Sequence, residues 1–163
     1  EDPFPDPASG RNQNLGGGFP NHWGGAGLFS TAADWLKLSN MLRKAVKGKE
    51  NPVANPELIR KMATNQLAGD IASLLPEGPE GFREWMPFEG LGMGLGVWVA
   101  QDSSRLAWNS NPGEFGWGGI ANTVFWIDPV SDSSVLFFTQ VMPSSQLGLR
   151  VALHRFAAEI LHR

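Results

Sequence analysis

The chain of 163 residues is 42% hydrophobic and 18% charged, a composition that favours one folded domain and argues against a disordered segment. Its formal net charge is −3 and its lysines and arginines form no concentrated basic face, which argues against nucleic acid as a partner. The absence of cysteine excludes disulfides and a thiol nucleophile, and no apolar run approaches the ~18 residues of a membrane span.

Helix signals follow an initial segment that is too rich in proline and glycine for regular structure. Residues 1–29 are therefore predicted to be a loop or linker. Thr31 with Asp34 three residues later is a capping-box pattern, and Gly48 lies where the helix that begins there should stop. Apolar residues at helical spacing mark one side of this helix, namely Trp35, Leu38, Leu42 and Ala45.

A second short helix is predicted from Asn55-Pro56, where an N-cap residue is followed by proline at the first helical position. Prolines recur in the stretch that follows, so it is expected to be irregular. Residues 30–89 are thus predicted to hold short helices and an irregular segment.

Strands are predicted from residue 90 onward, because the apolar residues change from a helical period to alternation. Gly94–Ala100 and Arg105–Trp108 flank a polar turn, and Thr123–Ile127 and Ser134–Val141 flank a segment rich in turn formers. Consecutive strands with short connections favour an antiparallel sheet.

The chain is predicted to close with a helix over about residues 146–161. Apolar residues line the side expected to cover the sheet, namely Leu149, Leu153, Phe156 and Ile160, and charged residues point elsewhere, namely Arg150, Arg155 and Glu159. Short helices, consecutive antiparallel strands and a packed C-terminal helix together define an α+β fold, with the sheet and last helix in residues 90–163.

Both alternating faces of the second strand pair are apolar, since 124–127 and 135–138 lack the polar residues of a wet face. The C-terminal helix can cover one face of the sheet. The two short helices are too small to cover all of the other, so we expect a segment outside this chain to complete the cover.

The stretch Gly113–Thr123, which contains Trp117-Gly118-Gly119 and runs into a hydrophobic strand and Asp128-Pro129, resembles a motif of the β-lactamase-related serine hydrolases. This family includes class C β-lactamases, similar carboxylesterases and D-amino-acid peptidases. Other passages resemble the family in the same chain order, namely Gly27–Ala32 with Asp34, Leu58 with Met62–Leu67, and Gly90–Gly96.

The resemblance implies part of a β-lactamase/transpeptidase-like fold, with residues 30–89 in its helical region and residues 90–163 in its α/β region. It makes Trp117-Gly118-Gly119 the family's third motif, on a strand that borders the active site. It also implies that the backbone N–H of Ile120 supplies half of an oxyanion hole, where donors meet the charge that develops during acyl transfer.

The resemblance assigns substrate-binding roles to the residues around this motif. Trp117 stands where other members carry Lys or His, and is expected to form an apolar wall for an acyl group. Gly118 and Gly119 have no Cβ, so substrate can lie close to the strand. Asn122 stands where glycine is common in the family, and Asn tolerates a left-handed backbone better than most residues.

The nucleophile of the family lies in a Ser-x-x-Lys motif, and none of the lysines here has a serine three positions earlier. The second motif, Tyr-x-Asn, is impossible in a chain without tyrosine, and its Ser-x-Asn variant is absent. The resemblance therefore implies that the nucleophile lies in an N-terminal segment of the same protein, which is the expected partner. The chain alone is expected to be inactive.

The expected substrate is a small acyl compound, either an ester, an amide or a β-lactam. An ester is preferred, because Trp117 replaces the cation that would meet a β-lactam carboxylate. No cofactor and no metal are expected, since His22, His154 and His162 show no ligand pattern and His154 fits a helix surface. Glu114 lies beside the proposed motif. The resemblance is compatible with a periplasmic or secreted protein.

Two alternatives to this enzyme stay open at this point. The seven tryptophans would suit a binding module with a carbohydrate or peptide groove. The chain would also fit a non-catalytic remnant or interaction subunit of the same fold.

Overall fold

The computed structural model describes residues 30–49, 53, 55–74, 88–119, 121–141 and 148–161. The chain divides into two units, Glu1–Thr31 and Ala32–Arg163, and the helices and strands described all belong to the second unit. They are α1 (Ala32–Val46), α2 (Pro56–Met62), α3 (Ile71–Leu74), β1 (Leu91–Met93), β2 (Trp98–Ala100), a 3₁₀ turn (Ser103–Arg105), β3 (Phe115–Gly118), β4 (Val124–Asp128), β5 (Ser133–Phe137) and α5 (Leu149–Leu161).

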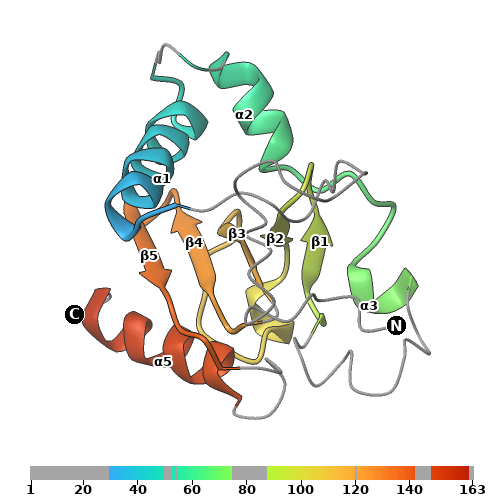
Figure 1. Ribbon diagram of the computed structural model, residues 1–163. Coiled ribbons are helices and arrows are strands. Elements are labelled where there is room, and N and C mark those ends of the chain that lie inside the picture. The colour runs from blue at the N-terminus through green and yellow to red at the C-terminus, as the bar shows by residue number, and fades with distance from the viewer. Residues whose placement is uncertain are drawn as a thin grey trace, which may run out of the picture. The chain divides into compact units, whose positions relative to one another are not determined.

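Within the described residues the strands form one sheet of five strands, in the order β1-β2-β3-β4-β5, with every neighbouring pair antiparallel (Figure 1). All four residues of β3 pair with β4, and Trp117 lies opposite Phe125. Of the residues of β3, only Phe115 and Gly116 also pair with β2. The second half of β3 therefore has a strand partner on one side only among the residues described.

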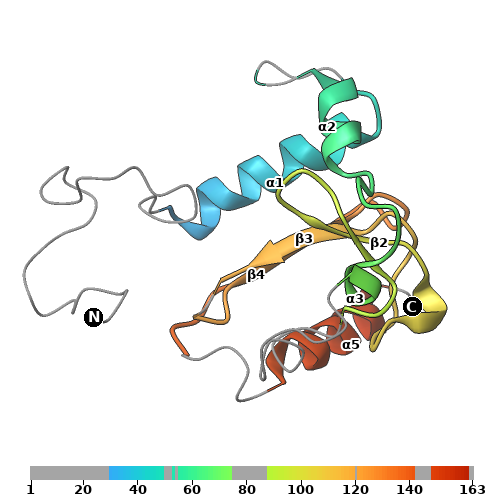
Figure 2. The same ribbon diagram turned by 90° about the vertical axis from the view of Figure 1, so that its right-hand side faces the viewer.

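Helices cover both faces of the sheet, with α1 and α2 on one face and α5 and α3 on the other (Figure 2). On the α1 face, Leu42 and Ala45 pack with Phe115 and Ile127. On the α5 face, the core includes Trp98, Trp108 and Trp126. The expectation of an α+β fold with a packed C-terminal helix is confirmed.

The first two helices begin and end where their capping residues predict. Helix α1 begins directly after Thr31, and Gly48 adopts a left-handed backbone with φ of 83° just beyond its last turn. At α2, the side chain of Asn55 accepts a hydrogen bond from the backbone N–H of Glu57 at 2.8 Å. The local signals at Thr31, Gly48 and Asn55 therefore agree with the observed start and end of α1 and the start of α2.

The prediction of a strand over Arg105–Trp108 is wrong. The side chain of Asp102 accepts hydrogen bonds from the backbone and the hydroxyl of Ser104, which turns the chain into a 3₁₀ turn instead. Strand β2, which lies inside the predicted strand Gly94–Ala100, pairs with β3 and also with β1, which precedes it. Alternation did not predict β1, but β1 lies within Gly90–Gly96, the passage that resembles a strand of the family.

The side of α5 that faces the sheet also differs from the prediction. The buried residues are Arg150, His154, Ala157 and Ala158, whereas Phe156 is 61% exposed. Two small alanines let the helix approach closely, and the sheet offers tryptophan rings that accommodate the imidazole of His154. Of the predicted side, Leu153 packs against the core while Phe156 and Ile160 are exposed, so the buried side of α5 is rotated toward its polar and small residues.

No helix among the described residues is both long enough and apolar enough to cross a membrane.

We predict that Ala157→Leu destabilises the protein by about 1–3 kcal/mol, because Ala157 is only 8% exposed against the sheet and extra methyl groups overpack the contact. The matched control is Ala152→Leu on the exposed side of the same helix, expected to change stability by less than about 0.5 kcal/mol. Urea unfolding gives both free energies. Equal costs for the two substitutions would contradict this orientation of α5.

Candidate active site

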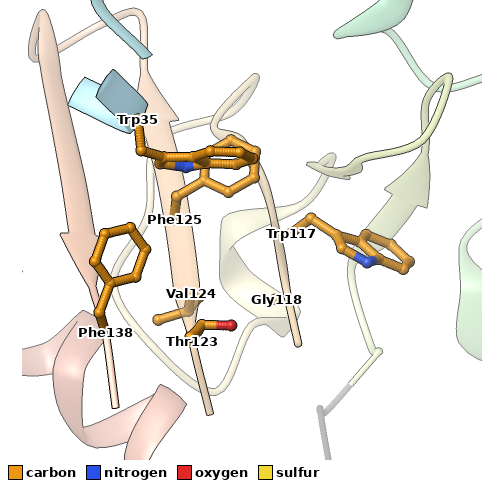
Figure 3. Close-up of a pocket in the computed structure, with 7 residues that line it drawn as sticks. All are labelled: Trp35, Trp117, Gly118, Thr123, Val124, Phe125 and Phe138. Atoms are coloured by element: carbon orange, nitrogen blue, oxygen red, sulfur yellow. The ribbon is translucent and has the colours of Figure 1, made fainter. Parts of the chain in front are cut away.

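An open apolar groove lies on the α1 face of the sheet, where α1 leaves the ends of β3 and β4 uncovered. Its volume is about 190 Å³. The residues that line it are Trp35, Trp117, Gly118, Thr123, Val124, Phe125 and Phe138. Figure 3 shows Trp35, Phe125 and Phe138 gathered on one side and Trp117 on the other.

Aromatic rings from α1, β3, β4 and the residue after β5 line this groove. The indole of Trp35 on α1 meets the ring of Phe125 on β4 edge to face, with centroids 5.3 Å apart. Trp117 and Phe138 are 36% and 46% exposed, which is unusual for such large apolar side chains. The groove is therefore a surface that favours an apolar ligand or another apolar segment.

The end of β3 turns sharply beside the groove. The backbone N–H of Gly119 donates to the carbonyl of Thr123 at 2.8 Å, and that of Asn122 donates to the carbonyl of Gly119 at 3.2 Å. Asn122 has φ of 61°, so the left-handed backbone expected at this position is present. Ile120, the predicted backbone donor, lies outside the described residues.

The side chain of Asn122 is fully buried and does not line the groove. Its Nδ2 donates to the carbonyl of Val141 at 3.1 Å, which ties the turn to the segment after β5. The residue shapes the turn through its backbone and this bond.

The missing Cβ of Gly118 makes room for a side chain on the α5 face. A Cβ at Gly118 would lie 2.7 Å from Cζ of Arg150, and Nη2 of Arg150 donates to the carbonyl of Gly119 at 2.7 Å. A Cβ at Gly119 would meet Oγ1 of Thr123 at 2.7 Å. The sequence argument missed Arg150, because a charged residue near the start of an amphipathic helix is normally solvated.

Glu114 and His154 form a buried pair on the α5 face, on the opposite side of the sheet from Trp117. Nδ1 of His154 lies 3.5 Å from Oε1 of Glu114, and both side chains are almost inaccessible. The imidazole stacks between the rings of Trp108 and Trp126, with centroids 4.4 Å and 3.8 Å away. The expectation that His154 lies on the helix surface is wrong, and Glu114 faces away from the groove.

Burial keeps both members of this pair neutral near pH 7. Desolvation raises the pKa of Glu114 to about 8, and the nearby Asp128 carboxylate adds to the shift while Ser110 and Trp108 oppose it. Desolvation also lowers the pKa of His154 to about 3, with a further contribution from Arg150. The contact is thus between two neutral groups, although its geometry resembles an ion pair.

Among the residues that the structure describes, no group of three His, Asp or Glu lies close enough together to hold a metal ion.

The antiparallel sheet between helices is shared with solved structures of the β-lactamase/transpeptidase-like fold. The family model described as Beta-lactamase matches residues 1–159. The chain belongs to this family.

Solved structures of the same fold include a hydrolase and a synthase. EstCE1, described as a hydrolase with promiscuous acyltransferase activity, is 27% identical, with a TM-score of 0.60 over 82% of this chain and 30% of that one. Unliganded simvastatin synthase (LovD) from Aspergillus terreus is 23% identical, with a TM-score of 0.65 over 86% of this chain and 37% of that one. The likeness to LovD shows the fold alone.

A curated relative is the protein Rv1367c of Mycobacterium tuberculosis (strain ATCC 25618 / H37Rv). It is 30% identical over 134 residues, which make up 79% of this chain and 31% of the relative. The chain thus spans less than one third of the length of this relative.

We predict that the wild-type protein loses stability as the pH rises from about 6.5 to 8. The Glu114→Gln variant is expected not to show this loss. The unfolded chain releases the Glu114 proton near pH 4.5, whereas the folded chain holds it to about pH 8, so deprotonation favours unfolding across this window. The lowered pKa of His154 makes stability rise with pH instead, but this rise is complete above about pH 6.5, where the unfolded chain has also released that proton. The expected wild-type loss is about 1–2 kcal/mol.

Thermal unfolding between pH 6 and 9 measures this effect. Glu159→Gln on the exposed side of α5 is the matched control and is expected to keep the wild-type profile. Parallel profiles for the wild type and Glu114→Gln would show that Glu114 is already ionised in the folded protein.

Proposed function

We propose that this chain is the C-terminal portion of a serine hydrolase that acts through an acyl-enzyme on an ester, an amide or a β-lactam. The nucleophilic serine and its lysine are carried by an N-terminal segment of the same protein. Family membership supports this proposal, as do the absence of Ser-x-x-Lys and of tyrosine in the chain and the small share of the relatives that it spans.

In this proposal, β3 borders the reacting carbonyl and the backbone N–H of Ile120 supplies half of the oxyanion hole. Such a donor acts best when it is held in place before charge develops, because no reorganisation is then needed. The hydrogen bonds of Gly119 and Asn122 support this role, since they fix the turn on either side of position 120. Gly118, Gly119 and Asn122 contribute to substrate binding through the shape of this turn.

The groove beside Trp117 is the observation that carries the proposal, because an apolar surface lies at the end of the strand that the resemblance makes the third motif. Its walls contain aromatic rings and no charged side chain among the described residues. An ester with an apolar acyl group fits this surface better than a β-lactam carboxylate, which requires a cation. EstCE1, described as a hydrolase with promiscuous acyltransferase activity, is consistent with acyl transfer.

The proposed N-terminal segment also has apolar surface to cover. Trp117 and Phe138 are exposed on the α1 face, and Phe156 and Ile160 are 61% and 54% exposed on α5. Exposed apolar residues on both sides of one sheet are typical of surfaces that another segment buries.

The alternative of a tryptophan-lined binding module has less support. Trp98, Trp108 and Trp126 are at most 3% exposed and belong to the core, so they cannot contribute to a binding row.

We predict that the full-length protein hydrolyses a nitrophenyl ester faster than a chromogenic cephalosporin, whereas this chain alone hydrolyses neither. Mass spectrometry of the full-length protein is expected to show an acyl adduct on the serine of a Ser-x-x-Lys motif, and replacement of that serine by alanine is the control. Absence of both turnover and adduct in the full-length protein would refute the proposal.

We predict that Trp117→Ala raises KM for a nitrophenyl octanoate about 10-fold and changes KM for the acetate much less. The longer acyl group loses apolar contact with the indole, at roughly 0.8 kcal/mol per buried methylene. Val130→Ala, at a 66% exposed residue between β4 and β5 that does not line the groove, is the control and is expected to change neither value. If KM rises equally for both esters, Trp117 does not form the acyl wall.

A further inference from the structure

Arg150 is an unusual residue for the buried side of a helix. It lies in the first turn of α5, is only 5% exposed, and its Nη2 donates to the carbonyl oxygen of Gly119 at 2.7 Å. Burial lowers the pKa of Arg150 to about 10, so the guanidinium remains charged at neutral pH. The bond to Gly119 is therefore charge-assisted and stronger than an ordinary backbone hydrogen bond.

Strand β3 has space for this guanidinium because Gly118 carries no side chain. A Cβ at Gly118 would lie 2.7 Å from Cζ, 2.7 Å from Nη2 and 2.9 Å from Nη1 of Arg150. The planar group thus packs flat against the strand at a residue without a side chain. Because side chains alternate along a strand, Gly118 faces α5 while Trp117 faces the groove.

The carbonyl of Gly119 accepts two hydrogen bonds, one from Arg150 and one from the backbone N–H of Asn122 at 3.2 Å. The N–H of Gly119 itself donates to Thr123 at 2.8 Å. Gly119, the last residue of the motif, is therefore fixed by hydrogen bonds both from the turn and from α5.

We propose that Arg150 is a positioning residue for acyl transfer, which fixes from the far face of the sheet the peptide group between Gly119 and Ile120. This inference rests on the proposed function, in which the N–H of that peptide group is an oxyanion donor. A peptide group is planar, so whatever fixes the direction of its carbonyl also fixes the direction of its N–H. A charged donor on the carbonyl further polarises the group and strengthens its N–H as a donor.

The inference gives Gly118 a role distinct from close approach of the substrate. The glycine admits Arg150, and a methyl group at this position would push the guanidinium away from the Gly119 carbonyl. The obstacle is the far end of a flexible side chain, so Gly118→Ala displaces Arg150 rather than the backbone of the core. Lysine cannot replace Arg150, because its ammonium is not planar and does not fit flat beneath the strand.

The test uses the full-length protein and a nitrophenyl ester, with Arg150→Lys, Gly118→Ala and the double variant. Each single substitution is expected to lower kcat by on the order of 10-fold to 100-fold, because one oxyanion donor is misaligned. KM is expected to change by less than about three-fold, because the groove lies on the other face. The double variant is expected to be no worse than either single variant, since both remove the same contact.

The affinity for a boronic acid distinguishes a positioning role of Arg150 from a merely structural one. The boronic acid forms a tetrahedral adduct with the serine, so its affinity is expected to fall in parallel with kcat/KM in each variant. Arg155→Lys is the matched control, because Arg155 on the same helix donates to the carbonyl of Ala107, which lies outside the strands. This control is expected to retain wild-type kcat and boronate affinity.

The outcomes separate the two proposals. If the wild-type protein turns over the ester but the variants keep its kcat and boronate affinity, the role of Arg150 is refuted and the proposed function stands. The same holds if kcat falls only in proportion to the folded fraction measured by circular dichroism. If the wild-type protein neither turns over the ester nor binds the boronate, the proposed function fails, and the role of Arg150 fails with it.

Discussion

The alternation of side chains along β3 is the constraint on which the candidate site depends. Trp117 and Gly118 are neighbours in sequence but face opposite sides of the sheet, where they meet different surroundings. The tryptophan borders the groove, and the glycine leaves space for Arg150. A shift of one residue in the pairing of β3 with β4 would exchange these faces and place the indole against the guanidinium.

Polar groups pack between α5 and the sheet together with apolar ones, namely Val151, Leu153 and Ala157. The imidazole of His154 stacks between two tryptophans beside Glu114, and Arg150 reaches the end of β3. Buried polar groups are costly unless they are paired or neutral, and the raised pKa of Glu114 and the lowered pKa of His154 reflect that cost. The helix thereby gains a specific register on the sheet, which an all-apolar contact would define less sharply.

The two faces of the sheet differ in how completely they are covered. The α5 face holds the buried tryptophans and the buried ionisable groups Glu114, Arg150 and His154, whereas the α1 face leaves aromatic rings in an open groove. In the proposed enzyme, chemistry therefore takes place on the less covered face and is supported from the other. The exposed residues of the groove and of α5 give the proposed N-terminal segment surface to bury on both sides.

The sequence by itself determined the features that depend on near neighbours along the chain. Thr31, Gly48 and Asn55 predicted helix ends, alternation predicted β4 and β5, and the motif around Trp117 indicated the family before any fold was known. Tertiary structure alone decided which side of α5 meets the sheet, that His154 is buried, and that Arg150 reaches Gly119. Periodicity shows which residues share a side of a helix, but the rings and spaces of the opposing sheet decide which side packs against it.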